Sequence, residues 1–179
     1  MPLYPLLIRG LGTLFGGNNL AAALLISSMA SFVAFYLLYQ LTQELTGSTS
    51  IAQVLVIALA VFPVSFFLMA GYTEALFLAL AIGSYLSTRR GCWLAAGILA
   101  ALATLTRLQG ILLLVPLGLE LLRTERQEPG RWRSWLPLLI APMTLALYIA
   151  FIRLTEGLTF PWEPLSAARG GWNLHYVWP

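Results

Sequence analysis

The sequence contains no lysine and no aspartate, so its ten basic side chains are all arginine and its seven acidic side chains are all glutamate. It has a single cysteine, Cys92, which excludes an internal disulfide. Charged residues make up only 9% of its 179 residues, too few to cover the surface of a soluble domain. The net charge of +3 is better explained by membrane topology than by nucleic-acid binding.

Long apolar runs fill most of the chain. Hydrophobic residues make up 59% of it, and the mean hydropathy is +0.83. This composition predicts one all-α membrane domain over residues 1–179, a polytopic transmembrane bundle of about six helices. We expect a short interfacial helix at 1–17, transmembrane helices within 20–154 and an extracytoplasmic loop at 155–179.

The apolar runs set the predicted helices and their ends. They lie at residues 20–41, 51–69, 75–86, 93–105, 111–122 and 135–154. Asn18 or Asn19 can cap the first helix, and the polar stretch 42–50 is expected to be a turn. Pro63 should kink the second run. Gly97 and Ala101 have the small-xxx-small spacing of helix packing.

The arginines predict which ends of the helices lie together. Arg89 and Arg90 precede the stretch 93–122, and four more arginines follow it in the predicted loop 123–134. The positive-inside rule places both clusters in the cytoplasm, so an even number of crossings lies between them. We therefore predict two short helices with Arg107 at their turn, and Glu74 at the turn of the preceding pair. Glu74 and Arg107 should share the extracytoplasmic end.

Glu74 is an ionisable residue between two apolar runs, where a charge is costly. One interpretation is a first-turn carboxylate that is stabilised by the helix dipole and capped by Thr73. The other is a polar group that lines an extracytoplasmic cavity.

Arg107 also has two interpretations. It can extend towards the lipid headgroups as an anchor, or its guanidinium fork can bind a phosphate. Thr104, Thr106 and Gln109 add hydrogen-bonding groups nearby, more than an anchor requires, which favours the phosphate site. His175 lies in an aromatic tail that indicates a membrane interface, although it could contact a sugar. The sequence shows no metal-binding cluster, nucleophile elbow or phosphate loop, and it leaves a role for a divalent metal open.

The segments "PLYPLLIRGLG" and "FPVSFFLMAGYTEALFLALAIGSYLSTRRGCWLAAGILAALATLTRLQGILLLVPL" resemble the bacterial relatives of the second mannosyltransferase of glycosylphosphatidylinositol anchor assembly. The motifs that carry the resemblance are Phe62-Pro63, Tyr72-Thr73-Glu74, Arg89-Arg90-Gly91 and Thr106-Arg107 with Gly110.

The resemblance implies a multi-pass enzyme of the C-type glycosyltransferase superfamily in the bacterial plasma membrane. It would transfer a sugar, by family analogy mannose, from a polyprenyl-phosphate donor to an acceptor on the extracytoplasmic face. Its partners would be the bilayer, the lipid-linked donor and an unidentified acceptor, with no nucleic acid. The expected substrate-binding residues are Arg107, Glu74, Tyr72, Thr73, Thr106, Gln109 and His175.

One departure from the family pattern concerns the catalytic base. Relatives carry an acidic residue, usually aspartate, in a loop that precedes the "PLYPLL" segment, whereas this chain starts at Met1 within that segment. We therefore expect an internal fragment that is inactive alone, and no base can be carried over, which leaves Glu74 as a candidate. The alternatives are a lipid transporter or flippase, for which no inverted repeat is evident, and a non-catalytic membrane scaffold.

Overall fold

The computed structural model describes residues 2–63, 65–127 and 132–156, and within them every regular element is a helix. The predicted all-α class is thus confirmed. The elements are α1 (Leu3–Leu14), α2 (Asn19–Thr46), α3 (Thr49–Val61), α4 (Phe66–Met69), α5 (Glu74–Arg89), α6 (Trp93–Thr106), the 3₁₀ helix η1 (Leu108–Leu113), α7 (Leu114–Gln127), the 3₁₀ helix η2 (Trp132–Leu139) and α8 (Ile140–Glu156).

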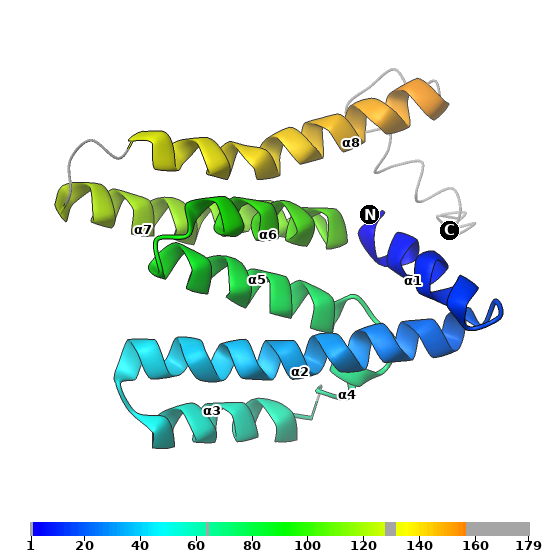
Figure 1. The fold of residues 1–179 in the computed structure, drawn as a ribbon, viewed down its shortest axis with the longest axis horizontal. Helices are drawn as coiled ribbons and strands as arrows, with labels where there is room; N and C mark the ends of the chain where they lie inside the picture. Colours follow the sequence, from blue (N-terminus) through cyan, green and yellow to red (C-terminus); the bar gives the residue numbers. More distant parts are fainter. Residues whose placement is uncertain (1, 64, 128–131, 157–179) are drawn as a thin grey trace, which may run out of the picture.

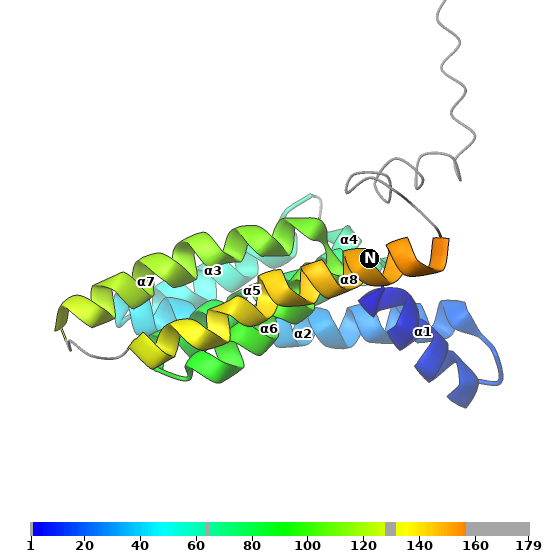
Figure 2. The same cartoon turned by 90° about the horizontal axis from the view of Figure 1, so that it is seen from above.

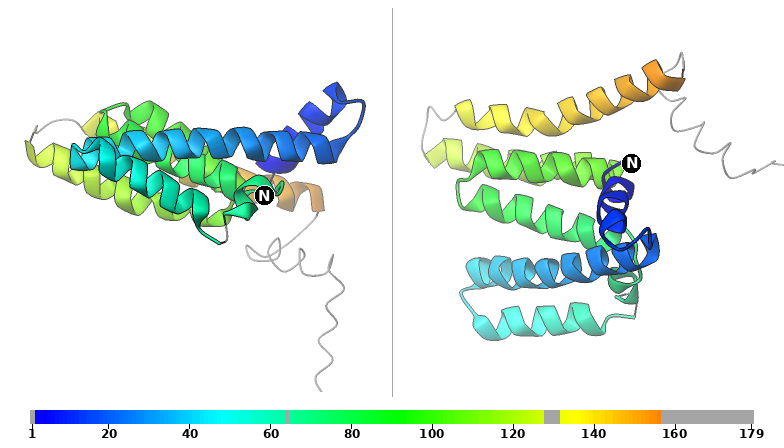
Figure 3. Two further views of the ribbon diagram at one scale, coloured as in Figure 1. Left: turned by 90° about the horizontal axis from the view of Figure 1, so that it is seen from below. Right: turned by 45° about the vertical axis from the view of Figure 1, so that its right-hand side comes forward.

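The long helices lie side by side, with α5 between α2 and α6 and with α8 against the other side of α6 (Figure 1). The turned view shows α7 beside this row rather than in line with it (Figure 2). Helix α1 packs against α2 and α6 at one end of the row (Figure 3). The same end holds the start of α5, the end of α6 and the end of α8 (Figure 1).

Helix α2 begins as predicted but ends later. The Asn18 side chain accepts a hydrogen bond from the Ala21 amide at 3.1 Å, so Asn18 is the N-cap. The stretch expected to form a turn at 42–50 is helical to Thr46, and only Gly47 and Ser48 separate α2 from α3. Gly47 closes the helix with a φ of 67°, a conformation that glycine adopts without strain.

Pro63 ends a helix instead of kinking one, so the predicted kink is wrong. Phe62, the residue before it, is extended with φ −60° and ψ 134°, and α3 stops at Val61. The proline ring disfavours helical geometry at the preceding residue. The chain resumes as the short α4 and then turns into α5.

The predicted hairpin after Arg90 is confirmed. Helix α6 ends at Thr106, the chain reverses at Arg107, and η1 and α7 return along the bundle. The predicted loop at 123–134 is shorter than expected, because α7 continues to Gln127 and η2 starts at Trp132.

Small residues bring the helices together. A Cβ atom on Gly97 would overlap the carbonyl group of Pro137, so η2 lies directly on α6 at this glycine. The predicted packing role of Gly97 is therefore confirmed. Between α5 and α6, the Ser84 hydroxyl donates to the Ala96 carbonyl oxygen at 3.0 Å.

The outside of the bundle is apolar. Leu154 is 87% exposed and Val61 is 77% exposed, and many other large apolar side chains lie on the surface. Within the described residues, two helical spans are long and apolar enough to cross a bilayer, namely Asn19–Thr46 and Trp135–Leu154, the second of which joins η2 to α8. Thr49–Val61 and Trp93–Thr106 are shorter apolar helices. An exposed apolar surface of this kind is typical of contact with lipid.

Candidate functional site

Glu74 and Arg107 meet at the end of the bundle that also holds α1. The Arg107 Nη1 group donates to Glu74 Oε1 at 2.7 Å, a charge-assisted hydrogen bond between residues 33 positions apart. The two side chains are about one third exposed, at 34% and 37%. The predicted proximity of these residues is therefore present as a direct ion pair.

The local backbone explains why both side chains reach this end. Glu74 is the first residue of α5, where the helix dipole favours a carboxylate. Arg107 directly follows α6 in an extended conformation, with φ −146° and ψ 139°. Its amide still bonds the Ala103 carbonyl oxygen at 2.9 Å, and the Gly110 amide bonds the Arg107 carbonyl oxygen at 2.9 Å. The arginine is thus held at a tight turn between two helices.

Two neighbours orient the Arg107 guanidinium and leave part of it available. The Nε group donates to Gln109 Oε1 at 3.2 Å, while Nη1 is bonded to Glu74. Among the described residues, no acceptor takes the Nη2 group. A guanidinium held on one side and open on the other is suited to bind an anion such as a phosphate.

A hollow of about 250 Å³ lies beside Glu74, at the junction of α3, α4 and α5. Its walls are Leu59, Phe62, Ser65, Phe67 and Leu68, together with Glu74 itself. The second carboxylate oxygen of Glu74, Oε2, is buried and has no hydrogen-bond partner within the described residues. A buried polar atom of this kind is costly, so it marks a place where a donor group would be favoured.

Tyr72 and Thr73 lie next to Glu74 in the chain. The Tyr72 ring packs edge-on against Phe67, with centroids 5.5 Å apart, and its side chain is about half exposed. Thr73 occupies the N-cap position of α5, but its side chain makes no capping hydrogen bond. The interpretation in which Thr73 caps the helix is wrong.

Thr104 and Thr106 are buried, and their hydroxyl hydrogens are bonded inside α6. Thr104 donates to the Ala100 carbonyl oxygen and Thr106 to the Leu102 carbonyl oxygen, each at 2.9 Å. The structure thus gathers Glu74, Arg107 and Gln109 at one point, whereas these threonines face into the bundle. His175 lies outside the described residues.

A network of hydrogen bonds that the sequence analysis missed holds the segment that precedes Glu74. Ser27 donates to the Tyr72 carbonyl oxygen at 3.1 Å, and the Tyr4 hydroxyl is 2.9 Å from the Ser27 oxygen. Ser31 donates to the Leu68 carbonyl oxygen at 2.6 Å. These bonds tie α1 and α2 to the segment that leads into Glu74. The signal was present as two serines four residues apart in an apolar helix.

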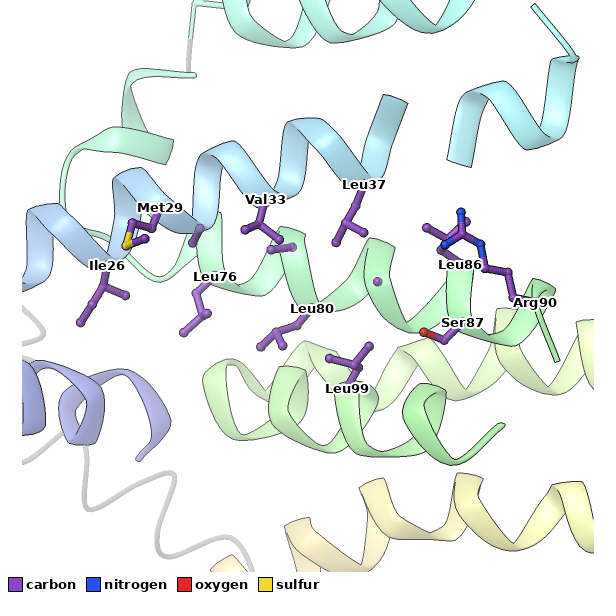
Figure 4. A pocket seen from close by; sticks show the side chains of 13 residues that line it. Ile26, Met29, Val33, Leu37, Leu76, Leu80, Leu86, Ser87, Arg90 and Leu99 are labelled. Atoms are coloured by element: carbon purple, nitrogen blue, oxygen red, sulfur yellow. The ribbon is translucent and has the colours of Figure 1, made fainter. Parts of the chain in front are cut away.

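A second hollow, of about 410 Å³, follows the face between α2 and α5 (Figure 4). Its side chains are almost all apolar, and Arg90 and Ser87 stand at the end away from Glu74 (Figure 4). Arg90 is held there by Glu44 and by Gln40. Most of the length of this hollow is therefore an apolar surface, and neither Glu74 nor Arg107 lines it.

Within the described residues, no group of three or more potential metal-ligating side chains occurs. The polar end offers a carboxylate and a guanidinium, groups that can bind a hydroxyl group and a phosphate.

Comparison with known families gives one match. The family model for dolichyl-phosphate-mannose-protein mannosyltransferases matches residues 1–153. It supports the predicted glycosyltransferase class, but not the closer resemblance to the second mannosyltransferase of glycosylphosphatidylinositol assembly. No curated protein and no solved structure matches the chain.

Proposed function

The chain belongs to the dolichyl-phosphate-mannose-protein mannosyltransferase family, and from this we propose a multi-pass membrane enzyme that moves mannose from a polyprenyl-phosphate donor to an acceptor hydroxyl. The observation that supports the site best is that Glu74 and Gln109 hold Arg107 by its Nη1 and Nε groups, while its Nη2 group has no acceptor among the described residues.

In the proposed reaction, the acceptor oxygen attacks the anomeric carbon of the mannose. A carboxylate takes the hydroxyl proton, the new C–O bond forms, and the bond from the anomeric carbon to the phosphate oxygen breaks. Polyprenyl phosphate leaves with the bonding electrons, and Arg107 stabilises the negative charge that develops on it. The configuration at the anomeric carbon is inverted.

We assign three tasks to Glu74 in this scheme. Its Oε1 atom orients Arg107, and its buried Oε2 atom is placed to accept a hydrogen bond from a sugar or acceptor hydroxyl. The adjoining hollow and its phenylalanine walls provide an apolar surface for the sugar ring. Glu74 is also the candidate for the base.

The donor class can be tested by binding. The purified protein in lipid nanodiscs should retain radiolabelled polyprenyl-phosphate mannose, because the site is proposed to bind a phosphate together with its lipid. Unlabelled polyprenyl phosphate should displace the label, whereas a nucleotide-activated mannose should not. Displacement by the nucleotide sugar alone would contradict the proposed donor.

The orientation of the site is a separate prediction. The end of the bundle that holds Arg107 should face the outside of the cell. The opposite end, which holds Arg89, Arg90 and Arg123, should face the cytoplasm, because positively charged segments are retained there. Single variants Gln109→Cys and Gly130→Cys, each on a Cys92→Ala background, can be treated with an impermeant thiol reagent in intact cells. We expect labelling at position 109 and none at 130, and the reverse pattern would invert the proposed topology.

A further inference from the structure

A second polar cluster lies at the opposite end of the bundle, where α5 packs beside α7. Arg89 Nη1 is 3.5 Å from Glu120 Oε1, and Arg123 Nη1 is 3.9 Å from Glu120 Oε2. Two arginines against one glutamate leave a net charge of +1. The Glu120 side chain is only 16% exposed and that of Arg89 26%, whereas Arg123 is 72% exposed.

One hydrogen-bond donor in this cluster has no acceptor. The Nε group of Arg89 is buried and unpaired within the described residues. A buried, unpaired donor is unfavourable, so this cluster favours a ligand that supplies acceptor oxygens.

A hollow of about 410 Å³ opens at the same place. Its walls are Tyr85, Pro116, Leu119 and Leu122, with Glu120 and Arg123 as its charged members. The surface of α7 around it is apolar and exposed, with Leu119 at 63% and Leu122 at 47%. A ligand that fits this site therefore has an anionic head that accepts hydrogen bonds and an apolar tail.

We propose that the Arg89–Glu120–Arg123 cluster binds the phosphate of an anionic phospholipid, with one acyl chain in the adjoining hollow between α5 and α7. The phosphate oxygens accept hydrogen bonds from Arg89 and Arg123, and the net positive charge favours an anionic headgroup over a zwitterionic one. This site depends on the membrane setting of the protein but not on the transferase reaction, and it lies at the end opposite Arg107.

The neighbouring Arg90 provides a matched control. It carries the same charge at the same end of the molecule, but its Nε and Nη2 groups already donate to Glu44 and Gln40. Arg90 is thus satisfied by the protein itself, whereas the Arg89 Nε group is not. Replacing Arg90 tests whether a general loss of positive charge is enough to weaken lipid binding.

The experiment is native mass spectrometry of the full chain after exposure to mixed phosphatidylglycerol and phosphatidylcholine. The parent should retain phosphatidylglycerol preferentially, and Arg123→Gln should lower this preference about tenfold, the loss expected for one charge-assisted bond. The double variant Arg89→Gln/Glu120→Gln removes the inner pair without leaving a lone buried charge, and it should lower the preference at least as much. Arg90→Gln should match the parent.

Three results would overturn the proposal. The first is an unchanged preference in Arg123→Gln, whose exposed side chain makes misfolding a poor explanation. The second is a loss of preference in Arg90→Gln as large as that in Arg123→Gln. The third is complete loss of the bound lipid when inorganic phosphate is added, because the ligand would then be a soluble anion. Donor binding at Arg107 is a separate measurement, so the two sites can fail independently.

Discussion

Replacing Arg107 by lysine or glutamine should weaken the binding of polyprenyl phosphate by about ten- to a hundred-fold, the effect of losing a charge-assisted hydrogen bond of roughly 1.5–3 kcal/mol. Lysine keeps the charge but lacks the planar fork that meets two phosphate oxygens at once. It also cannot reproduce the bonds from one guanidinium to both Glu74 and Gln109. An arginine that merely extended to the headgroups would tolerate lysine.

The control for this prediction is Arg9→Gln. Arg9 is an exposed arginine on α1. Helix α1 lies at the end of the bundle where α6 ends, directly before Arg107 (Figure 1). The Arg9→Gln substitution should leave the affinity for polyprenyl phosphate and the thermal stability unchanged. Titration of nanodisc-embedded variants with the lipid phosphate, alongside thermal unfolding, separates binding from folding. If Arg107→Lys binds like the parent, the anchor interpretation replaces the phosphate site.

Gly110→Ala should destabilise the protein by at least about 2 kcal/mol, because a side chain is forced into a packed contact that cannot move aside. A Cβ atom at this position would overlap the backbone of Ala103 and Thr104 in α6. The methyl group would push η1 away from α6 and displace the turn that holds Arg107. The variant should therefore lose donor affinity as well as stability.

Gly118→Ala is the matched control for Gly110→Ala. Gly118 is a helical glycine in α7, and a Cβ atom there would meet no atom within 4 Å. Alanine at such a site should be neutral or stabilising by up to about 1 kcal/mol. Thermal unfolding in one detergent compares the two variants. Equal midpoints would show that Gly110 is not needed for the close approach of η1 to α6.

Much of the arrangement could be predicted from where the charges stand. The lengths of the apolar runs and the positions of the arginines indicate which segments enter a bilayer and in which direction. They are enough to predict the hairpin at Arg107 and the location of Arg107 and Glu74 at the same end of the bundle. The direct bond between these residues could not be predicted in this way. It depends on the register of α5 against α6, which small residues and the Ser84 to Ala96 hydrogen bond determine.

The missed features have local causes. At Pro63 the sequence indicates a break, but whether the helix bends or ends depends on what the following residues pack against. From the sequence, Thr106 is expected beside Arg107 with its hydroxyl group available to a substrate. Its position on the inner side of α6 depends on the rotation of the helix about its axis, which the length of an apolar run does not determine. The network of Tyr4, Ser27 and Tyr72 joins segments far apart in the chain, so only the fold brings it together.

We infer that mannose transfer from a lipid-linked donor takes place at Arg107. The most direct test is the initial rate of mannose transfer from polyprenyl-phosphate mannose by membranes that contain the natural full-length protein. The parent and Arg9→Gln should transfer mannose, and kcat/KM should be about ten- to a hundred-fold lower in Arg107→Gln. Transfer at the parental rate by Arg107→Gln, or transfer that requires only a nucleotide-activated mannose, would contradict this inference.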